Sequence, residues 1–107
     1  KGREHEDRAA DYLLSLGYTI VTRRFKSGSG EVDLIALDGD TLVFVEVKFR
    51  GRGIPEEAVG HTKVKRFSDA VSGYMAKTGT HLSQTRFDLV AMTPTEIRHH
   101  KGAFNSL

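Results

Sequence analysis

The chain has 107 residues, a formal net charge of +2 and no cysteine. This length suits one domain, and the absence of cysteine excludes disulfide bonds and thiolate metal sites. No apolar run approaches the roughly 20 residues of a membrane-spanning helix, and no signal-peptide pattern opens the sequence, so we expect residues 1–107 to form a single cytoplasmic domain that does not associate with membranes.

The first part of the chain predicts a helix followed by three strands. Apolar and small residues recur at helical spacing from residue 3 to Gly17, a plausible helix end. Strands are expected at 18–25, 31–37 and 41–49, with a loop at 26–30 and a tight turn at 38–40. Strands joined by such short connections should be antiparallel.

The second part predicts a long helix and a returning strand. The helix should begin between Pro55 and Gly60 and end near Lys77, with Val64, Phe67, Val71, Tyr74 and Met75 as its apolar stripe. A strand at 86–92 and a short edge strand at 96–100 follow. Because the helix is long enough for a parallel crossover, we expect an α/β fold, with an αβββαβ core and a mixed central sheet flanked by helices.

The strand at 41–49 carries charges where a buried strand should have none. It is apolar on both faces, yet it contains Glu46 and Lys48. A two-residue Gly39–Asp40 turn would place Asp33 opposite Glu46, whereas an Asp38–Gly39 turn would shift the pairing by two. Facing carboxylates repel unless a cation such as Mg²⁺ joins them. The alternative is a structural set of ion pairs that also includes Glu31.

Glu6 is a candidate third acid, because helical spacing places it on the same face as Ala9, Ala10 and Leu13. It could equally be an ordinary first-turn acid that favours the helix dipole. The histidines show no zinc-binding spacing, and we expect His99 and His100 to be a surface pair.

Basic residues are concentrated rather than spread evenly. Six basic residues against two acids lie between Lys48 and Arg66, and a second cluster contains Arg23, Arg24 and Lys26. Such local excess suits a phosphate-rich partner, although a solvated surface would have the same composition.

The combined pattern resembles the PD-(D/E)XK nuclease superfamily, since Asp33 is followed after twelve residues by Glu46-Val-Lys48. The spacing is similar to that of archaeal Holliday junction resolvases. The chain looks most like the bacterial YraN-like family of small endonuclease-like proteins. The stretches that carry this likeness include Gly2-x3-Glu6, Gly30-Glu-Val-Asp-Leu-Ile-Ala36, Leu42-Val-Phe-Val-Glu-Val-Lys48 and Arg86-Phe-Asp-Leu-Val90. Two departures are Arg24, where the family often has asparagine, and Phe49, where it often has threonine.

The resemblance implies a Mg²⁺- or Mn²⁺-dependent endonuclease that hydrolyses phosphodiester bonds of DNA, including branched or damaged DNA. It implies that Asp33 and Glu46 bind the metal, that Lys48 positions water or offsets phosphate charge, and that Glu6 supports the metal site. Arg86 is expected to stabilise the fold or to bind phosphate. The residues expected to bind nucleic acid are Arg50, Arg52, Lys63 and Arg66.

Two alternatives remain from the sequence. The chain could be a non-catalytic nucleic-acid-binding module, or a protein-interaction module, that retains the nuclease fold. A homodimer could grip two DNA arms, but the sequence leaves the oligomeric state open.

Overall fold

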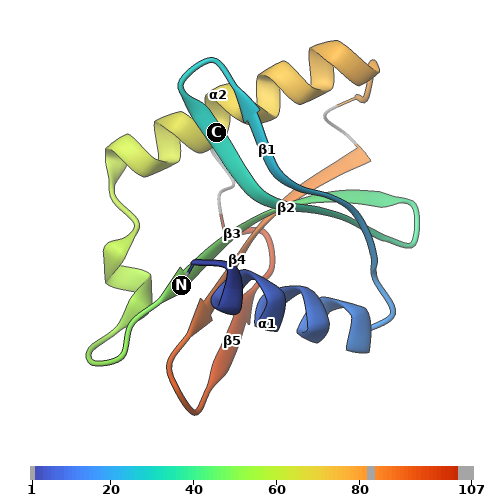
Figure 1. Cartoon of the computed structure of the whole chain (residues 1–107). Helices are drawn as coiled ribbons and strands as arrows, with labels where there is room; N and C mark the ends of the chain where they lie inside the picture. The colour runs from blue at the N-terminus through green and yellow to red at the C-terminus, as the bar shows by residue number, and fades with distance from the viewer. Residues whose placement is uncertain (1, 82–83, 104–107) are drawn as a thin grey trace.

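The computed structural model describes residues 2–81 and 84–103, except for the side chains of residues 2 and 61–63. It contains two α-helices, one 3₁₀ helix and five strands within those residues (Figure 1). In chain order these are α1 (Gly2–Ser15), β1 (Thr19–Ser27), β2 (Gly30–Asp38), β3 (Thr41–Phe49), η1 (Pro55–Ala58), α2 (His61–Thr78), β4 (Thr85–Met92) and β5 (Ile97–His100). None of the described helices is long and apolar enough to cross a bilayer.

The five strands form one mixed sheet in the order β1-β2-β3-β4-β5. β2 pairs antiparallel with both β1 and β3, β4 runs parallel to β3 after the α2 crossover, and β5 returns antiparallel to β4. This confirms the predicted α/β fold. The hairpin pairs Asp38 with Thr41 and Leu34 with Val45, which is the register expected for a Gly39–Asp40 turn.

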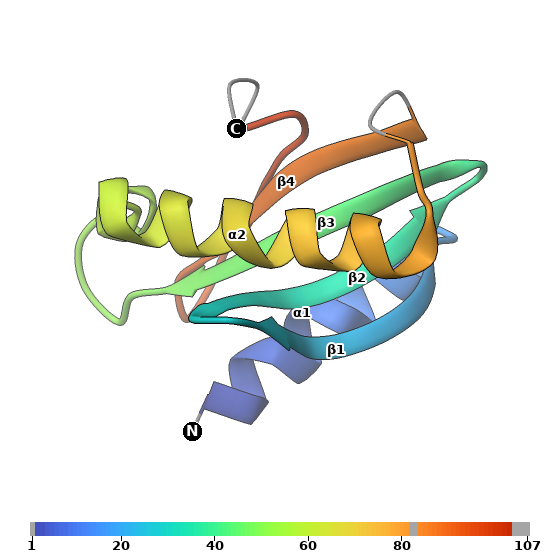
Figure 2. The ribbon, with the colours of Figure 1, turned by 90° about the horizontal axis from the view of Figure 1, so that it is seen from above.

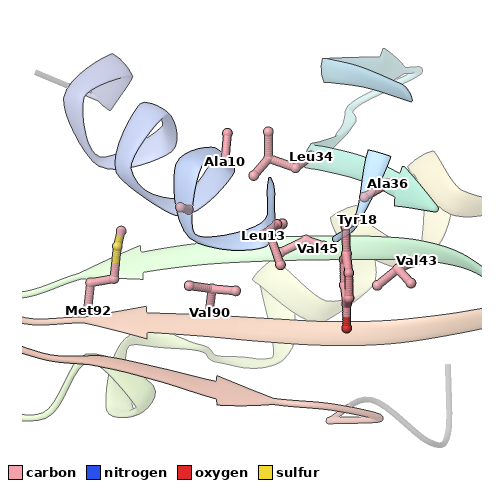
Figure 3. Packing of buried hydrophobic residues seen from close by; sticks show 10 residues of the cluster. Ala10, Leu13, Tyr18, Leu34, Ala36, Val43, Val45, Val90 and Met92 are labelled. Atoms are coloured by element: carbon pink, nitrogen blue, oxygen red, sulfur yellow. The ribbon is translucent and has the colours of Figure 1, made fainter. Parts of the chain in front are cut away.

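Opposite faces of the sheet are covered by different helices (Figures 1 and 2). On one face, Ala9, Ala10 and Leu13 of α1 pack on Val43 and Val45, and Figure 3 shows this layer. On the other face, residues of α2 pack on alternate residues of the same strand; this layer includes Phe67, Ala70, Val71, Leu42 and Phe44. β3 is therefore buried from both sides, as its double-sided apolar pattern predicted.

Glycine allows α2 to lie close to the end of β1 and the start of β2. A Cβ atom added at Gly30 would lie 2.0 Å from the backbone oxygen of Arg66, and one at Gly73 would lie 2.0 Å from Ser27 Oγ. Any side chain at Gly30 would push the helix backbone away. This contact places Arg66 beside the start of β2, where Glu31 and Asp33 lie.

A buried polar network joins α1 to β4 and β5. Asp88 is fully buried and accepts hydrogen bonds from Arg86, while its Oδ2 lies 2.7 Å from His99 Nε2. His99 Nδ1 is 3.2 Å from Tyr12 Oη, and the His99 side chain is only 6 % exposed. The expectation of a surface histidine pair is therefore wrong for His99, because Asp88 gives its ring a buried partner; His100 is exposed as expected.

A second polar contact ties η1 to β5. Arg98 donates to both carboxylate oxygens of Glu56 at 2.8 Å, and His100 Nε2 lies 2.7 Å from Glu56 Oε2. Hydrogen bonds from Arg98 and His100 hold the pKa of Glu56 well below its usual range. Glu56 thus anchors the segment that leads away from Lys48.

We expect Glu56→Gln to reduce the free energy of unfolding at pH 7 by up to about 1 kcal/mol, a modest loss because the pair is partly solvated. The pKa of Glu56 is lower in the folded state, so its stabilisation is present above its unfolded pKa of about 4.3 and is lost as the pH falls through the folded pKa. Urea unfolding from pH 7 to pH 2 should therefore show the two proteins converging in acid. The control Glu57→Gln removes the exposed acid that follows Glu56 in the chain, and its free energy of unfolding should match that of the wild type. A loss of stability equal to that of Glu56→Gln would contradict the role assigned to Glu56.

Candidate functional site

Asp33 lies where the regular pairing of β2 with β3 ends. The described ladder runs from Asp38↔Thr41 to Leu34↔Val45. Immediately beyond it, the backbone amide of Val47 donates to Asp33 Oδ2 at 2.7 Å. The Asp33 carboxylate thus accepts a hydrogen bond from the backbone of β3, which orients this side chain toward the residues that follow Val45.

Glu46 and Lys48 continue β3 from this point. Glu46 is only 5 % exposed, and its Oε2 lies 3.6 Å from Lys48 Nζ, whose side chain is 16 % exposed. A carboxylate and an ammonium group at this depth are costly without mutual stabilisation. Their placement on the central strand gives both groups a rigid base.

Glu6 faces the sheet, as its helical spacing predicted, and is 8 % exposed. Arg24 Nε lies 3.0 Å from each of its carboxylate oxygens. Arg24 has a φ of +54°, a left-handed conformation uncommon for arginine. Its guanidinium therefore holds Glu6 at the edge of the site.

Two cavities meet at Asp33. The larger, about 350 Å³, is lined by His5, Glu6, Asp33, Val47, Lys48 and Phe49. The smaller, about 80 Å³, is lined by Ser29, Glu31, Asp33, Glu46 and Arg66. Of the predicted residues, Glu6 and Lys48 therefore line the larger cavity, Glu46 lines the smaller, and Asp33 lines both.

The predicted phosphate-binding residues are divided by the structure. Arg66 lines the smaller cavity, while Arg50 and Arg52 are exposed on the segment between β3 and η1. The side chain of Lys63 lies outside the described residues. Arg86 is structural, since it bonds Asp88, Asp38 and the Tyr18 hydroxyl.

The carboxylates of this site suit a hard divalent cation that takes only some of its ligands from the protein. Among the residues whose side chains are described, no group of three or more His, Asp or Glu is placed to hold a metal ion. Asp33 and Glu46 offer carboxylate oxygens, and Mg²⁺ commonly uses one or two carboxylates and takes its other ligands from water and phosphate. The residues therefore fit Mg²⁺ better than they fit Zn²⁺, which prefers histidine and thiolate ligands in closed sites.

Two aromatic rings in the larger cavity were not singled out as functional residues by the sequence. His5 stacks on Phe49 with ring centroids 3.7 Å apart and planes 11° from parallel. Phe49 stood out only as a departure from the family pattern, and a lone histidine near a helix start gave no signal. The pairing depends on the tertiary contact between α1 and the end of β3.

Comparison with known proteins shows the family and the fold. The model of "Uncharacterised protein family UPF0102" matches residues 5–92. The chain is 41% identical over 108 residues to a UPF0102 protein of Persephonella marina, covering 98% of this chain and 93% of that protein. It is 44% identical over 111 residues to a UPF0102 protein of Rhodococcus jostii, covering 96% and 94%.

The fold is similar to that of Hjc, a Holliday junction resolvase from Archaeoglobus fulgidus. The TM-score is 0.55 at 15% identity, and the match covers 90% of this chain and 72% of Hjc. At this identity the likeness concerns the fold alone, a mixed sheet with helices packed on it. The chain therefore belongs to the UPF0102 family, the YraN-like group that its sequence resembles, and has a nuclease-like α/β fold.

Proposed function

We propose that this protein is a divalent-metal-dependent endonuclease that hydrolyses phosphodiester bonds of DNA. The observation that carries the proposal is the convergence of Asp33, Glu46 and Lys48 where the β2–β3 ladder ends, beside open cavities. A structural ion pair has no need of a cavity. The similarity to a resolvase fold supports the same interpretation.

In this proposal Asp33 and Glu46 would hold a Mg²⁺ or Mn²⁺ ion, which when bound stabilises negative charge on the phosphoryl oxygens. Asp33 is oriented by the Val47 amide, so its carboxylate is preorganised. Lys48 reaches Glu46 from the same strand and can orient the attacking water or offset charge that develops on the phosphate. Glu6, held by Arg24, supports the shape of the site rather than the ion directly.

The outer basic residues supply affinity. Arg50 and Arg52 are exposed just beyond Lys48, and Arg66 borders the smaller cavity. Phosphate contacts from such side chains position a nucleic acid without reading its sequence. Arg66 lies beside Asp33 at the smaller cavity, and Arg50 and Arg52 follow Lys48 of the larger cavity in the chain, so these arginines suit a phosphate backbone that passes the cavities.

The proposal is tested by incubating the protein with plasmid, linear duplex, single-stranded and four-way-junction DNA, each with Mg²⁺, Mn²⁺ or EDTA. Cleavage of at least one DNA that stops in EDTA and in Asp33→Asn is the expected result. Binding without cleavage on every substrate would instead support a non-catalytic module. Neither binding nor cleavage would favour a protein-interaction role.

Metal binding should also raise thermal stability, because a cation that binds only the folded state stabilises it by about 1.4 kcal/mol at ten times its Kd. For a domain of this size we expect the Tm to rise by about 5 °C or more with Mg²⁺ or Mn²⁺. Differential scanning calorimetry should show no such increment in Asp33→Asn/Glu46→Gln. The control Asp40→Asn/Glu57→Gln removes two exposed acids and should keep it; equal increments in all three proteins would place the ion elsewhere.

A further inference from the structure

The stacked pair of His5 and Phe49 connects two distant parts of the chain. His5 lies near the start of α1 and Phe49 is the last residue of β3. Their rings are nearly parallel, with centroids 3.7 Å apart, close to the roughly 3.4 Å spacing of successive bases in DNA. The pair is therefore a short aromatic stack with the geometry of two stacked bases.

This stack is a wall of the proposed active cavity rather than part of the closed core. His5 and Phe49 line the same cavity as Asp33 and Lys48, and both rings are only half-buried. Phe49 also packs against the α1 face of the core, which gives the stack a firm base. His5 is carried by α1.

We propose that His5, supported by Phe49, binds one unpaired base of the nucleic acid by stacking. This base lies next to the phosphodiester bond on which Lys48 acts. The inference rests on the proposed function, because it assigns the substrate of that same site. Every base has an aromatic face, so stacking on a protein ring tolerates any sequence.

The size of the cavity favours a single nucleotide over a duplex. About 350 Å³ is at the lower end of the range for small-ligand sites. A paired base is already stacked on both faces, so it must leave the helix before it can stack on His5. Substrates whose base is unpaired at a flap, bulge or junction avoid that cost. The chain should therefore prefer them to an intact duplex.

The experiment measures binding in EDTA, so that no cleavage occurs. Two matched DNA probes carry 2-aminopurine, either unpaired in a one-nucleotide bulge or paired in a duplex, and affinity and fluorescence quenching are recorded. We expect the wild type to bind the bulged probe at least about five-fold more tightly, in line with base–aromatic stacking, and to quench its fluorescence. His5→Ala should lose both effects, while His5→Phe should keep them.

His81→Ala is the matched control, because it removes an exposed histidine from the loop after α2. Phe49→Leu should lower the preference by removing the ring that supports His5. Circular dichroism checks that every variant is folded, and His5→Phe keeps the test valid if His5→Ala unfolds.

Two results would overturn the inference alone. If His5→Ala keeps the bulge preference, the base stacks elsewhere or not at all. If His5→Phe loses as much as His5→Ala, the imidazole acts by hydrogen bonding or charge. In both cases metal-dependent cleavage by the wild type would leave the proposed function standing. Absence of DNA binding and of cleavage would overturn both.

Discussion

Lys48→Ala should lower the cleavage rate at saturating DNA by 10²- to 10³-fold or more, the usual loss when one group that stabilises transition-state charge is removed. Lys48 Nζ lies 3.6 Å from Glu46 Oε2 and its side chain is mostly buried, so it is placed to act at the reacting phosphate rather than along the DNA backbone. DNA affinity should stay within a few-fold of the wild type. Single-turnover cleavage and fluorescence anisotropy measure the two quantities.

The exposed arginines provide the contrasting case. Arg50→Ala/Arg52→Ala should weaken DNA binding and reduce the slope of log affinity against log salt by about one unit for each phosphate that the protein no longer binds. Cleavage at saturating DNA should survive. Lys77→Ala, in the last turn of α2, controls for the removal of a surface charge. If Lys48→Ala loses affinity and keeps its cleavage rate, Lys48 binds phosphate and the mechanism proposed above is wrong.

The hairpin shows what local sequence can predict. Of the two turns that the sequence allowed, the structure has the register of the Gly39–Asp40 turn, with partners from Asp38↔Thr41 to Leu34↔Val45. The expected pairing of Asp33 with Glu46 would be the next step of this ladder and is not among its regular pairs. The structure adds the interruption of the ladder, where the Asp33 side chain accepts a hydrogen bond from the Val47 amide. Strand periodicity assumes continuous pairing and could not predict that change.

Contacts between distant segments account for what the sequence did not predict. Arg24 stood out in the sequence only as a departure from the family pattern that the chain resembles, and the structure gives it a left-handed φ of +54°, which is uncommon for arginine. Its hydrogen bonds to Glu6 span 18 residues. His99 looked like a surface residue because its partners, Tyr12 and Asp88, lie on other elements.

The network around Asp88 stabilises the fold and differs in its environment from the acids of the proposed active site. Burial alone would raise the pKa of Asp88, but hydrogen bonds with His99, Arg86 and the Gly102 amide outweigh it and hold the pKa below its ordinary value. Hydrogen bonds to Asp88 and Asp38 raise the pKa of Arg86, so Arg86 remains charged. Unlike Asp33, which borders two cavities, Asp88 is enclosed by its partners and is not accessible to a substrate.

Asp88→Asn should therefore destabilise the fold by about 3 kcal/mol or more at pH 7, since removing one member of a buried ion pair leaves the other uncompensated. The control Asp69→Asn breaks a solvent-exposed pair with Lys65 and should change stability by about 0.5 kcal/mol or less. The folded-state pKa of Asp88 is lowered, so its stabilisation is present above an unfolded pKa of about 3.9 and is lost as the pH falls through the folded value. Urea unfolding should show the wild type and Asp88→Asn converging only in strong acid. A loss below about 1 kcal/mol at pH 7, or a difference independent of pH, would mean that Arg86 and His99 are stabilised without this carboxylate.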